Sequence, residues 1–173
     1  MKTFGLVGWS GSGKTTLVAK LLPELIGRGF SVSTMKHTHH NFDIDRKGKD
    51  SYEHRVAGAT DVLITGSKRW ALLHENRDEP EPGIGDLLAR MEDVDLVLIE
   101  GFKSHGHQKM EVHRPDIGKP LLCADDPTIV AVASDAELKD VDLPVIDLED
   151  IKAIADFIIG HTGLEAGEKD GAA

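Results

Sequence analysis

The sequence has a single cysteine, Cys123, among its 173 residues, and aromatic residues make up only 5% of it. One cysteine cannot form an intramolecular disulfide, which excludes a disulfide-stapled secreted scaffold. No apolar run approaches the roughly 18 residues that a transmembrane helix needs. The amino-terminal segment also lacks the apolar stretch and small-residue cleavage site of a signal peptide. We therefore expect a cytoplasmic protein without a membrane partner.

Basic residues are scarce relative to acidic ones, with 20 Lys plus Arg against 30 Asp plus Glu and a formal net charge of −10. A surface of this charge repels nucleic acid and anionic lipids, so we expect no nucleic-acid partner. Any anionic ligand must be held by a local arrangement of donors. The apolar fraction of 40% is that of a globular protein with a buried core.

Short apolar runs alternate with amphipathic stretches along the chain, which is typical of an α/β domain. The patterns predict strands at 4–7, 31–35, 61–65, 70–74, 96–99, 110–113, 129–133 and 144–146, and helices at 14–26, 50–58, 85–92 and 148–159. Pro23 is expected to kink or shorten the first helix. Residues 1–160 are predicted to form one domain, and the Gly-, Ala- and charge-rich residues 161–173 a polar tail.

The strongest motif runs from Gly8 to Thr15 and matches G-x-x-x-x-G-K-[ST], between an apolar strand and an amphipathic helix. Glycines in such a loop let successive backbone N–H groups point at phosphate oxygens, and the helix adds the positive end of its dipole. The predicted nucleotide-binding residues of this motif are Gly11, Ser12, Gly13, Lys14, Thr15 and Thr16. Within this set the Lys14 ammonium would reach the β- and γ-phosphates, and the Thr15 hydroxyl would bind Mg²⁺. Thr16 either packs in the first turn or touches an α-phosphate.

A second acidic element is the apolar strand bounded by Asp95 and Glu100. These two residues are roughly 16 Å apart in an extended strand, so only one can face the phosphates. Ligands of open parallel sheets lie beyond the carboxyl ends of the strands. Glu100 is thus predicted to bind Mg²⁺ or a water of its shell, and Asp95 to cap the far end. A purely structural Glu100 is the alternative.

The segment between residues 36 and 59 is rich in His, Asp and Lys and poor in aliphatic residues, which favours contact with ligand over a place in the core. Asp43 and Asp45 would face one way in an extended segment, and one of them could orient an attacking water or hold a water of Mg²⁺. Arg55, in the following helix, could reach a phosphate. The alternatives are a solvated loop with capping acids and a surface ion pair of Arg55.

Together these motifs resemble the molybdopterin-guanine dinucleotide biosynthesis protein B (MobB) family. The resemblance spans about residues 3 to 159 and is carried by Trp9–Thr16, Lys36–His40, Gly48–Ser51, Arg55, Ala57–Ala59, Arg69–Leu72 and Glu100–Lys103. It implies a P-loop NTPase fold with a mostly parallel central sheet flanked by helices. It also implies a protein that binds GTP with Mg²⁺, is at most a weak GTPase, and is usually a homodimer. Relatives assist a molybdenum cofactor guanylyltransferase that joins GMP to molybdopterin, so molybdopterin itself is a further candidate ligand.

Base selection depends on Asp135, which follows an apolar strand. A carboxylate there can accept hydrogen bonds from N1–H and N2–H₂ of guanine, and the resemblance to MobB implies that it lies near the base. Ser134 with Glu137 also fits a capping box, S-x-x-E, at the start of a helical turn. The residues alone leave both interpretations open, and the resemblance favours guanine.

Two other functions fit parts of the sequence. The nine histidines, among them His37, His39, His40, His105 and His107, suggest a nickel metallochaperone GTPase. Cys123 has no neighbouring cysteine to complete such a site. A small-molecule P-loop kinase usually carries an arginine-rich lid, and no compact arginine-rich segment follows residue 100.

The predicted strands 61–65 and 70–74 form a hairpin that a minimal P-loop fold does not need. Exposed hairpin edges favour pairing with a second copy of the chain, with Trp70 in the interface. The alternative is a hairpin that folds onto its own sheet.

Overall fold

The computed structural model describes residues 1–38, 42–139 and 141–165. The chain forms two compact units. Met1–His37 and Asp93–Ala173 make up the first, which we call the P-loop unit, and Thr38–Glu92 make up the second, which we call the hairpin unit. No helix within the described ranges has the length and apolarity needed to cross a bilayer.

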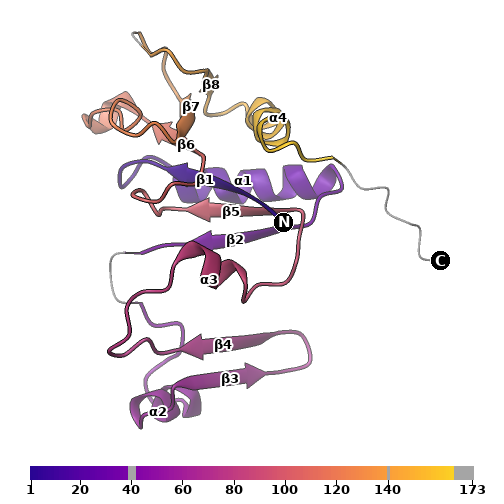
Figure 1. The fold of residues 1–173 in the computed structure, drawn as a ribbon, viewed down its shortest axis with the longest axis vertical. Coiled ribbons are helices and arrows are strands. Elements are labelled where there is room, and N and C mark those ends of the chain that lie inside the picture. Colours follow the sequence, from indigo (N-terminus) through magenta and orange to yellow (C-terminus); the bar gives the residue numbers. More distant parts are fainter. Residues whose placement is uncertain (39–41, 140, 166–173) are drawn as a thin grey trace, which may run out of the picture. The chain divides into compact units, whose positions relative to one another are not determined.

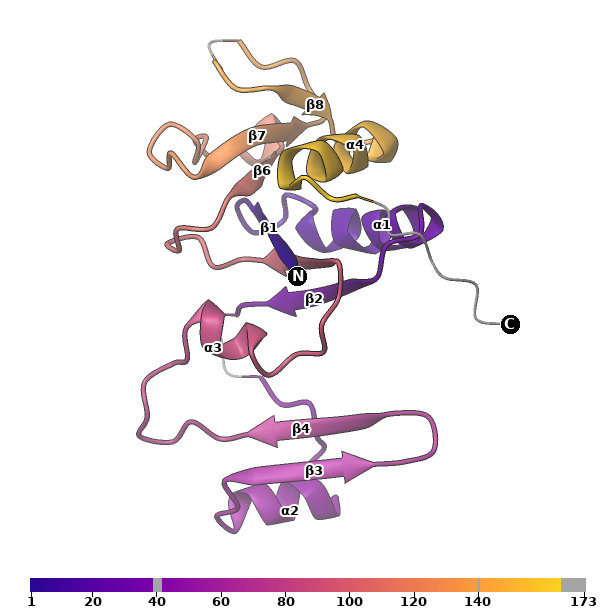
Figure 2. The same ribbon diagram turned by 45° about the vertical axis from the view of Figure 1, so that its right-hand side comes forward.

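The P-loop unit is built on a six-stranded sheet with the order β2-β5-β1-β6-β7-β8, and every neighbouring pair is parallel (Figure 1). The strands are β1 (Lys2–Val7), β2 (Val32–Lys36), β5 (Leu96–Glu100), β6 (Lys109–His113), β7 (Ile129–Ser134) and β8 (Val145–Asp147). Helices α1 (Lys14–Gly27) and α4 (Ile151–Thr162) lie together along the sheet (Figure 2). The expected fold class, a mostly parallel sheet flanked by helices with an added hairpin, is confirmed.

The apolar core lies between this sheet and helices α1 and α4. Alternate residues of the strands point into it, because successive side chains of a strand face opposite sides. In α1 the buried residues recur every four positions, at Leu17, Leu21 and Leu25. Strand and helix residues with at most 2% exposure form its centre: Phe4, Leu6, Leu17, Leu21, Leu25, Leu96, Leu98, Met110, Val112, Ala131, Ala133, Ile154, Ala155 and Ile158.

The other side of β6 carries three buried polar side chains, Lys109, Glu111 and His113. The ammonium of Lys109 donates to the Lys103 and His105 carbonyls at 2.9 and 2.6 Å. The Glu111 carboxylate accepts hydrogen bonds from the backbone N–H groups of Leu122 and Cys123, which follow the short 3₁₀ helix η1 (Pro115–Ile117). Buried charges are tolerated only when they are paired in this way, so β6 fixes both adjoining loops.

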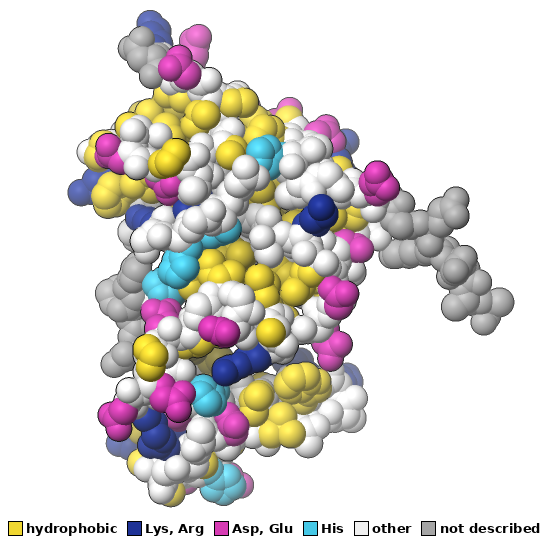
Figure 3. All heavy atoms as spheres, in the orientation of Figure 1, with side chains coloured by type: hydrophobic (Ala, Val, Ile, Leu, Met, Phe, Trp, Pro, Cys, Tyr) yellow, Lys and Arg dark blue, Asp and Glu magenta, His cyan; other side chains and the backbone are white. Residues whose placement is uncertain are grey.

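The hairpin unit contains α2 (Asp50–Val56), the antiparallel strands β3 (Asp61–Thr65) and β4 (Trp70–His74), and α3 (Ile84–Leu88). The register pairs Leu63 with Leu72 and Thr65 with Trp70. Leu63, Trp70 and Leu72 are 63%, 62% and 52% exposed. Hydrophobic side chains are accordingly visible over the β3–β4 hairpin in Figure 3. One face of this two-stranded sheet is therefore apolar and exposed.

The helix boundaries depart from the sequence predictions in four places. Helix α1 continues through Pro23 to Gly27. Helix α4 begins at Ile151, not at 148, because the Asp150 carboxylate accepts from the Ala153 N–H as an N-cap. Helix α2 begins after Lys49 and ends at Val56, before the expected residue 58, and α3 spans Ile84–Leu88 in place of the expected 85–92. Tertiary and capping contacts set these ends, and apolar spacing does not report them.

Candidate nucleotide site

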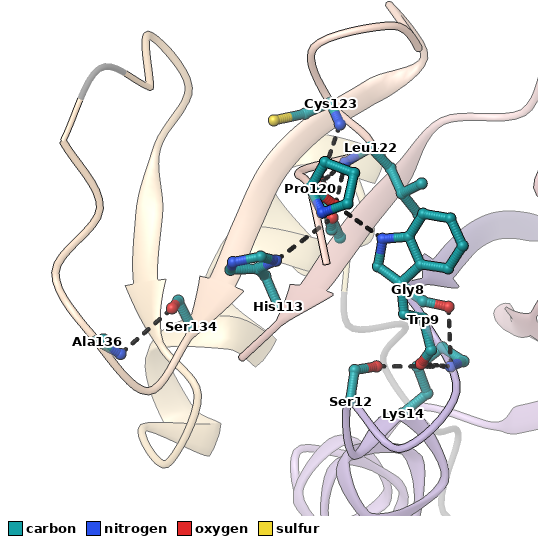
Figure 4. Close-up of polar contacts among 11 residues, drawn as sticks. Gly8, Trp9, Ser12, Lys14, His113, Pro120, Leu122, Cys123, Ser134 and Ala136 are labelled. Carbon is teal, nitrogen blue, oxygen red and sulfur yellow. Dashed lines mark hydrogen bonds and ion pairs between the residues drawn. The ribbon is translucent and has the colours of Figure 1, made fainter. Parts of the chain in front are cut away.

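The glycine-rich loop between β1 and α1 lies at the carboxyl ends of the parallel strands, as the motif predicts. Lys14 Nζ donates to the carbonyls of Gly8 and Trp9 at 3.0 and 2.8 Å and lies 3.5 Å from Ser12 Oγ (Figure 4). Burial lowers the pKa of Lys14, because loss of water disfavours the charged ammonium. An anionic phosphate at the loop would offset that loss. The carbonyls of the loop thus hold the Lys14 ammonium at the loop itself.

Gly8 is the position of the motif where a side chain is least tolerated. Its φ is 151°, and a Cβ there would lie 2.3 Å from the Val112 carbonyl oxygen. The loop therefore runs directly against the backbone of β6. Gly11 and Gly13 also have positive φ angles, 83° and 96°, in agreement with the turn that the motif predicts.

Thr15 and Glu100 meet beside the loop. Thr15 Oγ1 donates to Glu100 Oε1 at 2.9 Å, and the Glu100 side chain is 13% exposed. Hydrogen bonds from His37 N to Glu100 O and from Gly101 N to Leu6 O fix the end of β5. The far end of the strand holds Asp95, whose carboxylate accepts from the backbone N–H and hydroxyl of Ser31 at 2.7 Å. The structure thus brings the two predicted magnesium residues together and separates Asp95 from them.

Lys36, the last residue of β2, joins this pair. Its ammonium is 3.0 Å from Glu100 Oε1 and 3.4 Å from Thr15 Oγ1. The register of the parallel pair β2–β5 places Lys36 opposite Glu100. The motif alone did not identify Lys36 as a site residue. Its position as a cation at the carboxyl end of a strand was the available signal.

Asp135 follows β7 and forms an ion pair with Arg114, which follows β6. Arg114 Nε also donates to the Ser12 carbonyl of the loop at 3.3 Å, and its NH2 group lies 3.6 Å from a Glu149 oxygen. The Ser134 hydroxyl accepts from Ala136 N at 3.2 Å, so it caps a turn, and the next described element along the chain is the strand β8, not a helix. Arg114 is a second residue that sequence reasoning missed, and it links the loop to the predicted base-contacting residue.

Trp9 closes the loop on the side of β6. Its indole N–H donates to the Pro120 carbonyl at 2.8 Å (Figure 4). The ammonium groups of Lys103 and Lys119 lie 4.5 and 5.7 Å from the centre of the ring, within the range of cation–π contacts. Several cations therefore surround the phosphate loop of a protein whose net charge is −10.

The predicted residues Asp43, Asp45 and Arg55 form a cluster in the hairpin unit. Arg55 donates to Asp43 at 2.8 Å, to both oxygens of Asp45 at 2.9 and 3.2 Å, and to Glu75 at 3.3 Å. The hydrogen bond to Asp45 raises the pKa of Arg55 further above its usual range. The Asp45 side chain is 2% exposed, whereas that of Asp43 is 62% exposed. The cluster borders an open pocket of about 660 Å³ within the same unit.

The chain matches one protein-family model, that of "Molybdopterin guanine dinucleotide synthesis protein B" (MobB), over residues 3–135. It is 43% identical to a molybdopterin-guanine dinucleotide biosynthesis adapter protein of Escherichia coli, over 87% of each chain. It is 44% identical to the adapter protein of Haemophilus influenzae, over 89% of this chain and 85% of that one. The chain belongs to the MobB family.

Solved MobB structures have the same fold. A crystal structure of MobB superposes with a TM-score of 0.73 at 26% identity, covering 92% of this chain and 99% of that one. The Bacillus subtilis MobB structure gives a TM-score of 0.74 at 22% identity, over 94% and 98% of the chains. The expected family and fold are therefore confirmed, and with them a nucleotide-binding protein of the P-loop class.

The nine histidines of this MobB-family chain are candidate metal ligands in addition to Thr15 and Glu100. Within residues 1–38, 42–139 and 141–165, no group of three or more His, Cys, Asp or Glu side chains is placed to hold a metal ion. His39 and His40, on which the nickel interpretation also drew, lie outside the described residues. The His37 ring packs against the Phe102 ring at a tilt of 40°, with 4.6 Å between ring centres.

Proposed function

We propose that the protein is a GTP-binding adapter that assists the transferase forming molybdopterin guanine dinucleotide. The main observation in support of this proposal is the arrangement of Lys14, Thr15 and Glu100 at a loop that contains the complete phosphate-binding motif. The pathway is supported by the Escherichia coli and Haemophilus influenzae relatives, which are molybdopterin-guanine dinucleotide biosynthesis adapter proteins. An adapter needs to bind and present a nucleotide, and rapid turnover is not required of it.

Guanine selection is proposed for Asp135. Arg114 engages Asp135 Oδ2, and a carboxylate has a second oxygen that can accept from a base. Arg114 also bonds the loop carbonyl of Ser12, which supports a base position close to the phosphates. Exchange of Asp135 for Asn would remove an acceptor for the two guanine donors, so the preference for GTP over ATP should fall. An unchanged preference would reject this role.

Magnesium is proposed to accompany the nucleotide, held by Thr15 and Glu100. A hydroxyl and a carboxylate are the hard oxygen ligands that Mg²⁺ prefers, and P-loop proteins bind it together with phosphate oxygens. Bound there, the ion would neutralise charge on the phosphates. The residues of this chain would orient it: Thr15 from the first turn of α1 and Glu100 from the end of β5.

Weak hydrolysis is proposed to depend on the acidic cluster of the hairpin unit. Asp43 is exposed and uses one oxygen for Arg55, whereas Asp45 is buried and bonds Arg55 with both oxygens. This difference supports Asp43 as the acid that orients water and Asp45 as the residue that positions Arg55. Arg55 would contact phosphate, where its positive charge would stabilise the negative charge that develops during phosphoryl transfer.

A homodimer is proposed through the exposed face of the β3–β4 hairpin. A two-stranded sheet is marginally stable by itself, and apolar residues such as Leu63, Trp70 and Leu72 favour cover by a second copy. Light scattering at micromolar concentration should give twice the 18.8 kDa of one chain. Leu72→Asp should return the mass to that of one chain. A parent protein with the mass of one chain would reject the dimer.

The adapter function is tested with the partner enzyme. Adding this protein with GTP should raise the transferase's yield of guanine dinucleotide cofactor, and Lys14→Ala should abolish the increase. Lys152→Ala, an exposed lysine of α4, is the control for loss of one positive charge. Equal stimulation by the parent and by Lys14→Ala would show that bound nucleotide is irrelevant to the partner.

A further inference from the structure

The ammonium of Lys36 contacts the two oxygens that are proposed to hold Mg²⁺, Glu100 Oε1 and Thr15 Oγ1. Lys36 Nζ, Glu100 Oε1 and Thr15 Oγ1 form a closed triangle with sides of 3.0, 3.4 and 2.9 Å. All three side chains belong to the P-loop unit. The Lys36 ammonium therefore occupies the position that is proposed for the Mg²⁺ ion.

The backbone dictates this contact. Lys36 and Glu100 are register partners in the parallel pair β2–β5, so their side chains emerge on the same side of the sheet. The hydrogen bond from His37 N to Glu100 O, 2.9 Å long, extends the pairing by one residue. Glu100 is 13% exposed and held in place, whereas Lys36 is 58% exposed. Lys36 is thus the member of the triangle that is free to move.

The same two oxygens are spaced for a metal ion. Adjacent ligands of octahedral Mg²⁺, each about 2.0–2.1 Å from the ion, are about 2.9 Å apart. Thr15 Oγ1 and Glu100 Oε1 are separated by 2.9 Å. An ion bound by this pair would lie within contact distance of the Lys36 ammonium. Two cations cannot share one carboxylate oxygen at that distance without strong repulsion, so binding of one must displace the other.

We propose that Lys36 is a positioning residue that exchanges with Mg²⁺ and then binds the terminal phosphate of the nucleotide. The proposal rests on the proposed magnesium–nucleotide site. The γ-phosphate shares the coordination shell of the ion, so its oxygens lie close to the place that the ammonium leaves. The flexible four-carbon stem of a lysine allows such a shift. Lys14 would remain on the loop, and Lys36 would add a cation that only a triphosphate can use.

Two effects of opposite sign follow for Lys36→Met. Without nucleotide, the variant should bind a divalent ion more tightly than the parent, because no ammonium competes for Glu100. With nucleotide, its preference for GTP over GDP should fall, because the γ-phosphate loses a partner. Each effect should be roughly tenfold, the size expected for one charge-assisted hydrogen bond. A lysine with a merely structural role would produce neither effect.

The probe for the first effect is Mn²⁺, titrated into the protein without nucleotide and followed by the electron spin resonance of the free ion. The second is measured by isothermal titration of GTP and GDP at fixed Mg²⁺. Lys152→Met is the matched control, because it removes one positive charge from an exposed site on α4 and should behave as the parent. Lys36→Arg keeps the charge and should retain the preference for GTP. Thermal unfolding verifies that each variant is folded, and Lys36→Gln replaces Lys36→Met if the latter is not.

The proposed exchange would be overturned if Lys36→Met bound Mn²⁺ as tightly as the parent or more weakly. An unchanged ratio of GTP to GDP affinity in this variant would also overturn it. Failure of the proposed nucleotide function has a different signature, since the parent protein itself would then bind no GTP. A tighter Mn²⁺ site combined with a lower GTP preference, in Lys36→Met and not in Lys152→Met, would support the exchange.

Discussion

The two units of this protein bury their apolar residues to very different extents. In the P-loop unit, strands and helices enclose a core whose central residues are at most 2% exposed. In the hairpin unit, Val62 is the one buried apolar residue among the described residues, while Leu63, Trp70 and Leu72 are exposed. The P-loop unit is thus stabilised by its own core. The hairpin unit is held by polar contacts, of which the Arg55 cluster is the largest.

That difference suggests that the two units have different functions. A binding site needs side chains fixed by rigid surroundings, and the P-loop unit supplies them. A surface that meets other molecules needs exposed apolar and charged groups, and the hairpin unit supplies those. Changes in the P-loop unit should therefore affect stability and nucleotide affinity, and changes in the hairpin unit should affect association and turnover.

Removal of a core side chain should have the largest effect on stability. Leu21 is fully buried between α1 and the sheet, and Leu21→Ala should lower the free energy of unfolding by about 2–5 kcal/mol. Val56, at the end of α2 and 62% exposed, is the contrast, and Val56→Ala should cost no more than about 0.5 kcal/mol. Urea denaturation followed by circular dichroism measures both. Equal costs would mean that α2 is buried against a further surface.

Lys14→Ala should weaken GTP binding by at least about 1.5–3 kcal/mol while leaving the fold intact, because the variant loses a charge-assisted contact to phosphate. Isothermal titration calorimetry gives the affinity, and Lys152→Ala controls for the change in net charge. The circular dichroism spectrum of Lys14→Ala should match that of the parent. An unchanged GTP affinity would reject the phosphate site.

Asp43→Asn should slow GTP hydrolysis by roughly tenfold or more and change GTP affinity much less, since its proposed role concerns the attacking water. Asp45→Asn should also slow hydrolysis, because it loosens Arg55. Glu53→Gln on the exposed side of α2 is the control within the same unit. Hydrolysis at the parent rate in both aspartate variants would show that the cluster only stabilises the hairpin unit.

The smallest predicted effect concerns the dependence of stability on pH. His107 packs against Gly5, and its two ring nitrogens are buried with no hydrogen-bond partner among the described residues. Burial, followed by the nearby Lys109 and His105, lowers the pKa of His107 from 6.5 to about 4, and Asp126 opposes this shift. Between these two values the unfolded chain binds more protons than the folded one. Stability should therefore fall as the pH drops from about 6.5 towards 4.

His107→Leu removes this titration. The difference in melting temperature between pH 7 and pH 5 should be smaller in the variant than in the parent. His54→Leu, an exposed residue of α2, should leave that difference as it is in the parent. A parent-like difference in His107→Leu would assign the acid sensitivity to other groups.

Much of the fold could be predicted because its signals are local. The motif from Gly8 to Thr15 requires a strand, a turn and a helix in sequence, and the apolar runs at β5 and β7 have the composition of buried parallel strands. The pair Thr15 and Glu100 followed from the rule that ligands bind at the carboxyl ends of parallel strands. Helix ends were less predictable, since α4, which Asp150 caps, begins at Ile151, three residues beyond the start that apolar spacing indicated.

By itself, the sequence determined the phosphate loop, the fold class and the family, because these depend on residue types at fixed short spacings. Only the tertiary structure decided which distant side chains meet. Lys36 and Glu100 are joined by the register of β2 and β5, Arg114 reaches Ser12 from the end of β6, and Arg55 is surrounded by Asp43, Asp45 and Glu75. Parallel pairing and loop packing link residues far apart in the chain, and no local pattern encodes the register in which they come together.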